Sequence, residues 1–254
     1  MTILPVSFFV TAILYASVGF GGGSTYSALL VLAETDYRIL PAIALICNVI
    51  VVSGGAYRFF RAGHVNLRRI GPWIITSVPA AWLGGYLNIS ETLFTGLLGF
   101  SLLAAGFRMF RAEKERQDST EILINQYRFL PPVTGALLGL LAGLVGIGGG
   151  IFLAPVLHLL RWDDARKIAA TCSVFILVNS IAGLIGQSMK LSNLELAGDI
   201  MLYWMLFPAV LIGGQIGSYM GATRLNPDTL RVLTAVLILY VAARLLFRWV
   251  AVVA

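Results

Sequence analysis

The stretch that decides the fold occurs twice: Gly19-Phe20-Gly21-Gly22-Gly23, and then Gly146-Ile147-Gly148-Gly149-Gly150 at an offset of 127 positions. Each run lies in the middle of a long apolar segment. The match continues at the same offset with two further pairs, Asp36 with Asp163 and Asn66 with Asn193. The pattern predicts an internal duplication, and each half opens with a glycine-interrupted hydrophobic segment. Interrupted segments at corresponding positions of two halves typically mark a binding site within a membrane.

The composition is that of a protein embedded in a membrane. Hydrophobic residues make up 58% of the chain and charged residues 12%, and the mean hydropathy is +0.87. A soluble protein cannot cover so apolar a surface, and the apolar runs are continuous rather than alternating as in a β-barrel. We therefore expect an all-α polytopic integral membrane protein. The net charge of +6 comes from Lys and Arg at the ends of apolar runs, so nucleic acid is not expected as a partner.

Eight apolar segments divide into two sets of four. The first transmembrane repeat is expected over residues 1–111, a polar inter-repeat linker over 112–128 and the second repeat over 129–254. The expected segments are 3–33, 39–60, 71–89, 92–110, 132–160, 168–189, 200–221 and 230–250. Six have about the 20 residues that one membrane crossing needs.

The two glycine-interrupted segments are longer than one crossing needs. A straight helix over 3–33 or 132–160 would span about 45 Å, against a hydrocarbon core of ~30 Å. Each segment is therefore either a strongly tilted, broken helix or a re-entrant hairpin whose arms meet at the glycines. The first alternative gives four crossings per half and parallel repeats. The second gives three crossings per half and inverted repeats.

The distribution of basic residues favours inversion. With parallel repeats the cytoplasmic side would hold 12 of the 18 Lys and Arg residues, and with inverted repeats it would hold 14. The loop around His64 is strongly basic, whereas its partner around Asn193 has one Lys. Positive residues gather on the cytoplasmic side, so matching loops should differ in this way if they face opposite sides.

The glycine runs have two interpretations. Small residues let helices pack closely, which fits the ladders Gly135, Gly139, Gly143 and Gly213, Gly217, Gly221. Three consecutive glycines cover every face of a helix, which packing does not need, and each weakens the helix by about 1 kcal/mol relative to Ala. We predict that Gly21, Gly22 and Gly23, and likewise Gly148, Gly149 and Gly150, form breaks with exposed backbone. Helix N-termini at such breaks bind anions without basic side chains.

Neutral polar residues on neighbouring segments are candidates for the rest of the site. They are Ser24, Thr25, Asn48, Ser53, Thr171, Ser173, Asn179 and Ser180. The alternative for each is an interhelical hydrogen bond worth about 0.6 kcal/mol. The apolar interiors contain no Lys, Arg, Asp or Glu, whereas cation carriers usually have an intramembrane carboxylate. The sequence therefore favours a small anion as ligand, and it predicts no catalytic residue, no metal site and no cofactor.

These motifs together resemble the TauE/SafE sulfite exporter family, also called the toluene sulfonate uptake permeases. The similarity rests on the two glycine segments, on Ala170-Thr171-Cys172-Ser173, and on the Pro-Ala and Gly-Gly elements of each half. It implies transport of sulfite, thiosulfate, sulfoacetate or another organosulfonate across the bacterial cytoplasmic membrane. It also implies eight spans, the parallel count, which conflicts with the charge distribution. Ser24 and Thr25 are matched by Ile151 and Phe152, which predicts an asymmetric site.

The expected function is secondary transport of a small anion by alternating access. An anion channel shares every static feature, and a membrane-embedded enzyme or accessory subunit is a more distant alternative. The expected partners are the anionic substrate and the lipid bilayer, and a homodimer is left open.

Overall fold

The computed structural model describes residues 3–17, 20–111, 129–160, 162–163, 165–220 and 227–253. These residues form helices joined by turns, with no strand among them, as the sequence predicts. The predicted linker, 112–128, lies outside the described residues. The helices are α1 (Ile3–Ser17), α2 (Gly23–Leu32), α3 (Leu40–Arg61), α4 (Leu67–Tyr86), α5 (Glu91–Arg111), α6 (Leu130–Val145), α7 (Gly150–Leu159), α8 (Ala165–Asn193), the 3₁₀ helix η2 (Ala197–Tyr203), α9 (Leu206–Met220) and α10 (Pro227–Val253).

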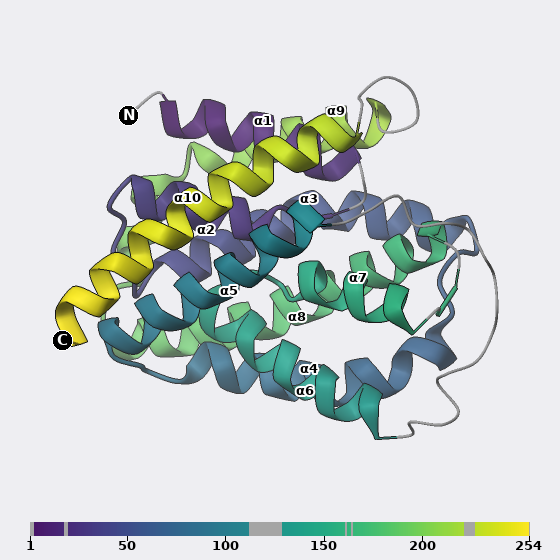
Figure 1. Ribbon diagram of the computed structural model, residues 1–254, viewed down its shortest axis with the longest axis horizontal. Helices are drawn as coiled ribbons and strands as arrows, with labels where there is room; N and C mark the ends of the chain where they lie inside the picture. Colours follow the sequence, from purple (N-terminus) through teal and green to yellow (C-terminus); the bar gives the residue numbers. More distant parts are fainter. Residues whose placement is uncertain are drawn as a thin grey trace.

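The bundle has two ends, which we name after the loops that lie there. The Asp36 end holds the α2–α3 loop, and the Asp163 end holds the α7–α8 loop. Helices α3, α4, α5, α8, α9 and α10 run between the two ends (Figure 1). Local sequence sets several of their starts: Pro41 lies in the first turn of α3, and the side chain of Asn66 caps α4 by accepting from the Arg69 amide.

The first glycine-interrupted segment enters and leaves at the Asp36 end. Helix α1 packs parallel to α9, with Gly213 against Phe9 and Gly217 against Ile13. The chain then reverses, so that Tyr15 Oη on α1 lies 2.8 Å from Thr25 Oγ1 on α2. Helix α2 returns to the Asp36 end, where the loop to α3 begins (Figure 1).

The second interrupted segment enters and leaves at the opposite end. Helix α6 begins beside Trp73, against whose backbone Gly135 packs. Trp162, just beyond α7, meets the same Trp73 edge-on, with ring centroids 6.2 Å apart. Both arms thus reach the start of α4. Among the described residues, each interrupted segment is therefore a fold-back pair of short helices, the geometry that the inverted count requires.

By length and apolar composition, two helices of the described chain could each cross a membrane alone, α3 and residues 167–193 of α8. Residues 197–203 and 206–217 qualify together as a pair bent by 56°. The sequence had predicted six segments of crossing length, and the bend between η2 and α9 was not predicted.

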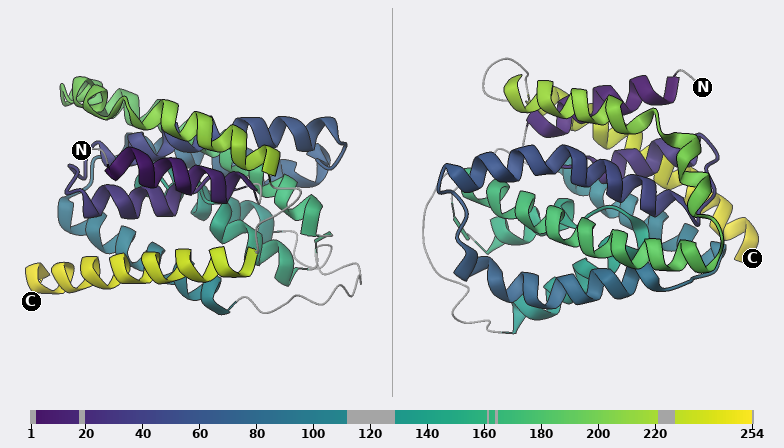
Figure 2. Two further views of the ribbon diagram at one scale, coloured as in Figure 1. Left: turned by 90° about the horizontal axis from the view of Figure 1, so that it is seen from above. Right: turned by 180° about the vertical axis from the view of Figure 1, so that it is seen from behind.

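The strongest packing joins helices from opposite halves of the sequence. Helix α4 lies against α6 and α8, and α9 lies against α1 and α3. Gly139 meets the backbone of Ser77, and Gly143 that of Ala81, which confirms the predicted packing role of this ladder. We call α4, α6, α7 and α8 bundle A, and α1, α2, α3 and α9 bundle B. The two bundles meet mainly along α3 and α8 (Figure 2), while α5 and α10 pack on each other.

Candidate functional site

The two glycine breaks meet at one side chain, Asn48 of α3. A Cβ built on Gly21 would lie 2.5 Å from Asn48 Oδ1, and one built on Gly23 would lie 2.5 Å from Asn48 Nδ2. A Cβ on Gly148 would lie 2.9 Å from the same Nδ2. Asn48 Nδ2 also donates to the Gly146 carbonyl at 3.4 Å. A buried amide therefore contacts both breaks, although they are far apart in sequence.

The backbone at the breaks requires glycine for its conformation as well as for space. Gly22, Gly146, Gly148 and Gly149 have φ values of +83°, +80°, +79° and +75°, in the left-handed region that side chains disfavour. The breaks also touch each other, since a Cβ on Gly23 would lie 2.7 Å from the Ile147 carbonyl oxygen. Helix packing alone does not call for left-handed residues.

Each break ends in the N-terminus of a short helix. The first helical hydrogen bonds of α2 are accepted by the Gly22 carbonyl, and those of α7 by the Gly149 carbonyl. The amides of Gly23 and Gly150 therefore precede the first bonds and have no acceptor within their own helices. These N–H groups and the positive ends of the two helix dipoles favour an anion near Asn48.

Two polar atoms at the breaks are buried and have no hydrogen-bond partner within the described part of the chain. They are Asn48 Oδ1 and Ser180 Oγ, on side chains that are fully buried. A Cβ on Gly148 would lie 3.2 Å from Ser180 Oγ. Buried polar groups are normally satisfied, so these two atoms are available to bond a group bound at the breaks.

The other predicted site residues make separate contacts. Ser53 is exposed and its hydroxyl donates to the Ile50 carbonyl at 3.0 Å, a contact within α3, so its place in the site stays a prediction. Asn179 donates to the Phe175 carbonyl at 2.9 Å. Thr25 bonds Tyr15, as described above.

Ser173 donates to the Ala169 carbonyl at 2.9 Å. Ser24 and Thr171 are buried. Gly149 and Gly150 face Phe175 and Ile176 of α8. Of the predicted polar residues, Asn48 and Ser180 lie beside the glycine breaks, and the assignments of the others stay predictions.

The sequence analysis did not predict the backbone and apolar groups that lie at the site. The carbonyls of Gly146 and Ile147 line the junction, and Ile176 packs against Gly148 and Gly150. The repeat contained one indication that Asn48 is special, because at the offset of 127 it is matched by Phe175. The central amide therefore has no polar counterpart in the second half.

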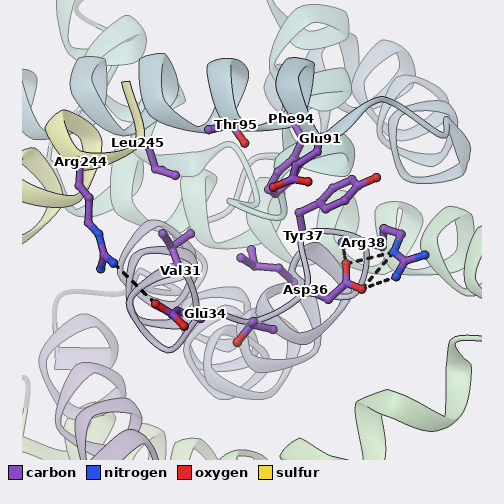
Figure 3. Close-up of a pocket in the computed structure, with 12 residues that line it drawn as sticks. Val31, Glu34, Asp36, Tyr37, Arg38, Glu91, Phe94, Thr95, Arg244 and Leu245 are labelled. Carbon is purple, nitrogen blue, oxygen red and sulfur yellow. Dashed lines mark hydrogen bonds and ion pairs between the residues drawn. The ribbon is translucent and has the colours of Figure 1, made fainter. Parts of the chain in front are cut away.

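A separate pocket of about 630 Å³ lies at the Asp36 end between the α2–α3 loop, α5 and α10 (Figure 3). Arg38 Nη2 pairs with Asp36 Oδ2 at 2.6 Å, and Arg244 Nη2 lies 3.9 Å from Glu34 Oε1. Hydrogen bonds from Arg38 lower the pKa of the Asp36 carboxyl, so this pair stays charged well into the acid range. Both arginines lie beside carboxylates, so the pocket has no excess positive charge to attract an anion.

At the Asp163 end, ionic and aromatic contacts fasten α4 to the α7–α8 loop. Arg69 Nη1 lies 3.1 Å from Asp163 Oδ2, and Lys167 Nζ lies 2.8 Å from Asp163 Oδ1. The Arg69 guanidinium also lies 5.0 Å from the ring centroid of Trp162. All of these residues belong to bundle A or its connecting loop. Within the described residues, no cluster of His, Cys, Asp and Glu could hold a metal ion.

Comparison with known proteins identifies the family of the chain. The family model described as "Sulfite exporter TauE/SafE" matches residues 3–245. Probable membrane transporter protein y4hK of Sinorhizobium fredii is 34% identical over 249 residues, covering 96% of this chain and 97% of the relative. Probable membrane transporter protein YjnA of Bacillus subtilis is 24% identical, covering 97% and 99%.

Sulfite exporter TauE/SafE family protein 1 of Arabidopsis thaliana is 30% identical over 161 residues, covering 61% of this chain and 35% of the relative. No solved structure matches the chain. The match over nearly the whole sequence, together with a helical bundle that contains membrane-length apolar helices, shows that this chain is a membrane transporter rather than an enzyme and belongs to the TauE/SafE sulfite exporter family.

Proposed function

We propose that the protein is a secondary transporter of a small sulfur-containing anion, such as sulfite, thiosulfate, sulfoacetate or another organosulfonate. The observation that carries the proposal is the meeting of two helix N-termini at Asn48 between the two bundles. Backbone amides and helix dipoles hold anions without a cationic side chain. The names of the matching family and of its plant member support a sulfur oxyanion as the cargo.

Neutral groups at the junction also argue for a small anion. The side chains that contact the breaks include Asn48, Ser180, Ile176 and Phe175, and none of them carries charge. A cation in this apolar setting would need a carboxylate beside it. An anion would instead exchange its hydration shell for N–H and hydroxyl donors.

A Cβ built on Gly23 would lie 2.7 Å from the Ile147 carbonyl oxygen, so the two breaks approach each other closely. Entry of an anion therefore requires the breaks to separate. Gly23 belongs to bundle B and Ile147 connects helices of bundle A, so separation means movement of one bundle against the other. We propose alternating access in which the moving parts are the two bundles, rather than the two halves of the sequence.

The orientation of the bundle in the bacterial cytoplasmic membrane follows from its charges. Arg58, Arg61, Arg68 and Arg69 lie toward the Asp163 end, which would therefore face the cytoplasm. Single cysteines introduced at Asp36 and at Asp163, in a background without Cys47 and Cys172, should react with an impermeant maleimide from opposite sides of intact cells. Labelling of both positions from one side would contradict the inverted arrangement.

Flux into proteoliposomes tests the function itself. Vesicles with purified protein should accumulate radiolabelled sulfite, thiosulfate or sulfoacetate with saturable kinetics, and the flux should respond to an imposed ion gradient. Protein-free vesicles provide the control for leakage. Unsaturable flux that ignores the gradient would favour an anion channel, and the absence of flux for every sulfur anion would remove the proposed substrate class.

A further inference from the structure

We infer that Phe20 and Ile147 are the two gates of the transport pathway. Phe20 closes the path from the glycine breaks to the Asp163 end, and Ile147 closes the path from the breaks to the Asp36 end. The inference rests on the proposed function, and it names the side chains that control access to the site from each side of the membrane.

The two side chains hold equivalent places in the repeat. Each follows the first glycine of its run, Phe20 after Gly19 and Ile147 after Gly146, at the offset of 127. Each run connects the two short helices of its fold-back pair, α1 and α2 in the first case and α6 and α7 in the second. The equivalent residues therefore lie at the tips of two helical hairpins that enter from opposite ends of the bundle.

Helix α3 shows how deep each tip reaches, because it runs between the two ends and has Asn48 near its middle. The tip that enters from the Asp163 end passes Asn48, since a Cβ built on Gly146 would lie 2.7 Å from Pro41 Cα, in the first turn of α3. The tip that enters from the Asp36 end passes Asn48 in the other direction. There Phe20 packs against an apolar cluster that includes Ala56, in the second half of α3. Each tip thus lies between the site and the end opposite to its own entry.

Both side chains pack against residues of the other bundle. Phe20 connects helices of bundle B, but it packs against the apolar cluster of bundle A near the Asp163 end, which includes Trp73 and Leu157. Ile147 connects helices of bundle A and is only 5% exposed. It lies in a cluster built largely from bundle B, α5 and α10 near the Asp36 end. An apolar side chain offers an anion nothing to replace its hydration shell, so each contact blocks passage while it holds.

Movement of the bundles can release these contacts one at a time. Helices α3 and α8 run antiparallel along the interface between the bundles. A rocking motion about Asn48 that parts them at the Asp163 end presses them together at the Asp36 end. Phe20 then leaves bundle A while Ile147 stays buried, and the opposite tilt releases Ile147 while Phe20 stays in place. The site therefore opens to one side at a time.

Side-specific labelling of a reporter cysteine in the site tests the two gates separately. Ser180→Cys, in a background without Cys47 and Cys172, is treated with an impermeant thiol reagent in right-side-out and in inside-out membrane vesicles. Phe20→Ala should raise the labelling rate from the Asp163 end by about tenfold or more and leave the rate from the Asp36 end unchanged, because loss of the ring weakens only one closed contact. Ile147→Ala should have the converse effect.

Two isoleucines provide matched controls. Ile74 of α4 is partly buried against the same bundle A cluster as Phe20, and Ile43 of α3 is fully buried in the same cluster as Ile147. Neither lies at a hairpin tip, so Ile74→Ala and Ile43→Ala should keep both labelling rates at the wild-type level. The milder Phe20→Leu should give a smaller increase from the Asp163 end alone, whereas a misfolded protein would react from both sides.

Flux measurements separate this inference from the function on which it rests. Each single variant retains one gate and should keep saturable flux, whereas the double variant Phe20→Ala/Ile147→Ala should give an unsaturable leak. Absence of wild-type flux for every sulfur anion would remove the proposed function, while side-specific labelling would still support the gates. Saturable wild-type flux would leave the function standing even if the gates fail. The gates are overturned if each single variant labels equally from both sides, if the isoleucine controls show the same side preference, or if the double variant stays saturable.

Discussion

Spin labels at Ile75 and Val133 should give one distance that does not change when the anion is added, whereas labels at Ile75 and Val10 should give two. Ile75 on α4 and Val133 on α6 come from different halves of the sequence but lie in bundle A. Val10 on α1 comes from the same half as Ile75 but lies in bundle B. All three side chains are well exposed, at 73%, 56% and 45%, and so can accept a label.

The prediction follows from how each pair of helices is held. Gly135, Gly139 and Gly143 of α6 pack against the backbone of α4, so α4 and α6 cannot slide apart without losing this close contact. Between the bundles, the junction includes the 3.4 Å hydrogen bond from Asn48 Nδ2 to the Gly146 carbonyl. It also includes two buried polar atoms without partners among the described residues. The tightly packed pair should behave as a rigid body, and the junction should be where motion occurs.

Double electron–electron resonance in nanodiscs, with and without the anion and at several pH values, provides the measurement. A disulfide between cysteines introduced at Val51 and Gly214 is the companion control, because their Cβ atoms would lie 3.8 Å apart within bundle B and in different halves. It should leave the second Ile75–Val10 distance accessible. Motion in the Ile75–Val133 pair with a constant Ile75–Val10 distance would show that the sequence halves move, and two constant distances would contradict both schemes.

Much of this architecture could be predicted from the sequence because glycine is so specific in its effects. Consecutive glycines disrupt a helix whatever surrounds them, so both breaks were located correctly. Glycines four apart mark one helix face, so the ladder at 135–143 was assigned to packing correctly. The charge distribution favoured the fold-back arrangement that the structure has, because loop charge is a local property that sequence shows directly.

The remainder depends on contacts that no local pattern encodes. Ser53 and Ser180 hold equivalent positions in the sequence, yet one hydroxyl is exposed and the other is buried at a break. The pairing of α4 with α6 similarly depends on glycine contacts across two halves, and a sequence read in order suggests instead that each half packs on itself.

Gly148→Ala should reduce the flux by tenfold or more in protein that remains folded. Gly148 has φ +79°, where a side chain costs about 1–2 kcal/mol. The added methyl group would lie 2.9 Å from Asn48 Nδ2 and 3.2 Å from Ser180 Oγ. To avoid either close contact, Asn48 or Ser180 must move, and we propose that both bind the anion. The flux per folded molecule should therefore fall, in addition to any loss of stability. Flux per folded molecule and thermal unfolding in detergent are measured on the same preparations.

Two other glycines serve as controls because their surroundings differ. Gly55, within α3, has no atom within 4 Å of a built Cβ, so Gly55→Ala should keep full flux and raise the unfolding free energy by up to about 1 kcal/mol. Gly139 meets the Ser77 backbone, so Gly139→Ala should lower stability by about 1–3 kcal/mol while the folded fraction stays active. Packing predicts that flux per folded molecule is equally preserved in Gly148→Ala and Gly139→Ala. A selective loss in Gly148→Ala is expected only if the break itself contacts the anion.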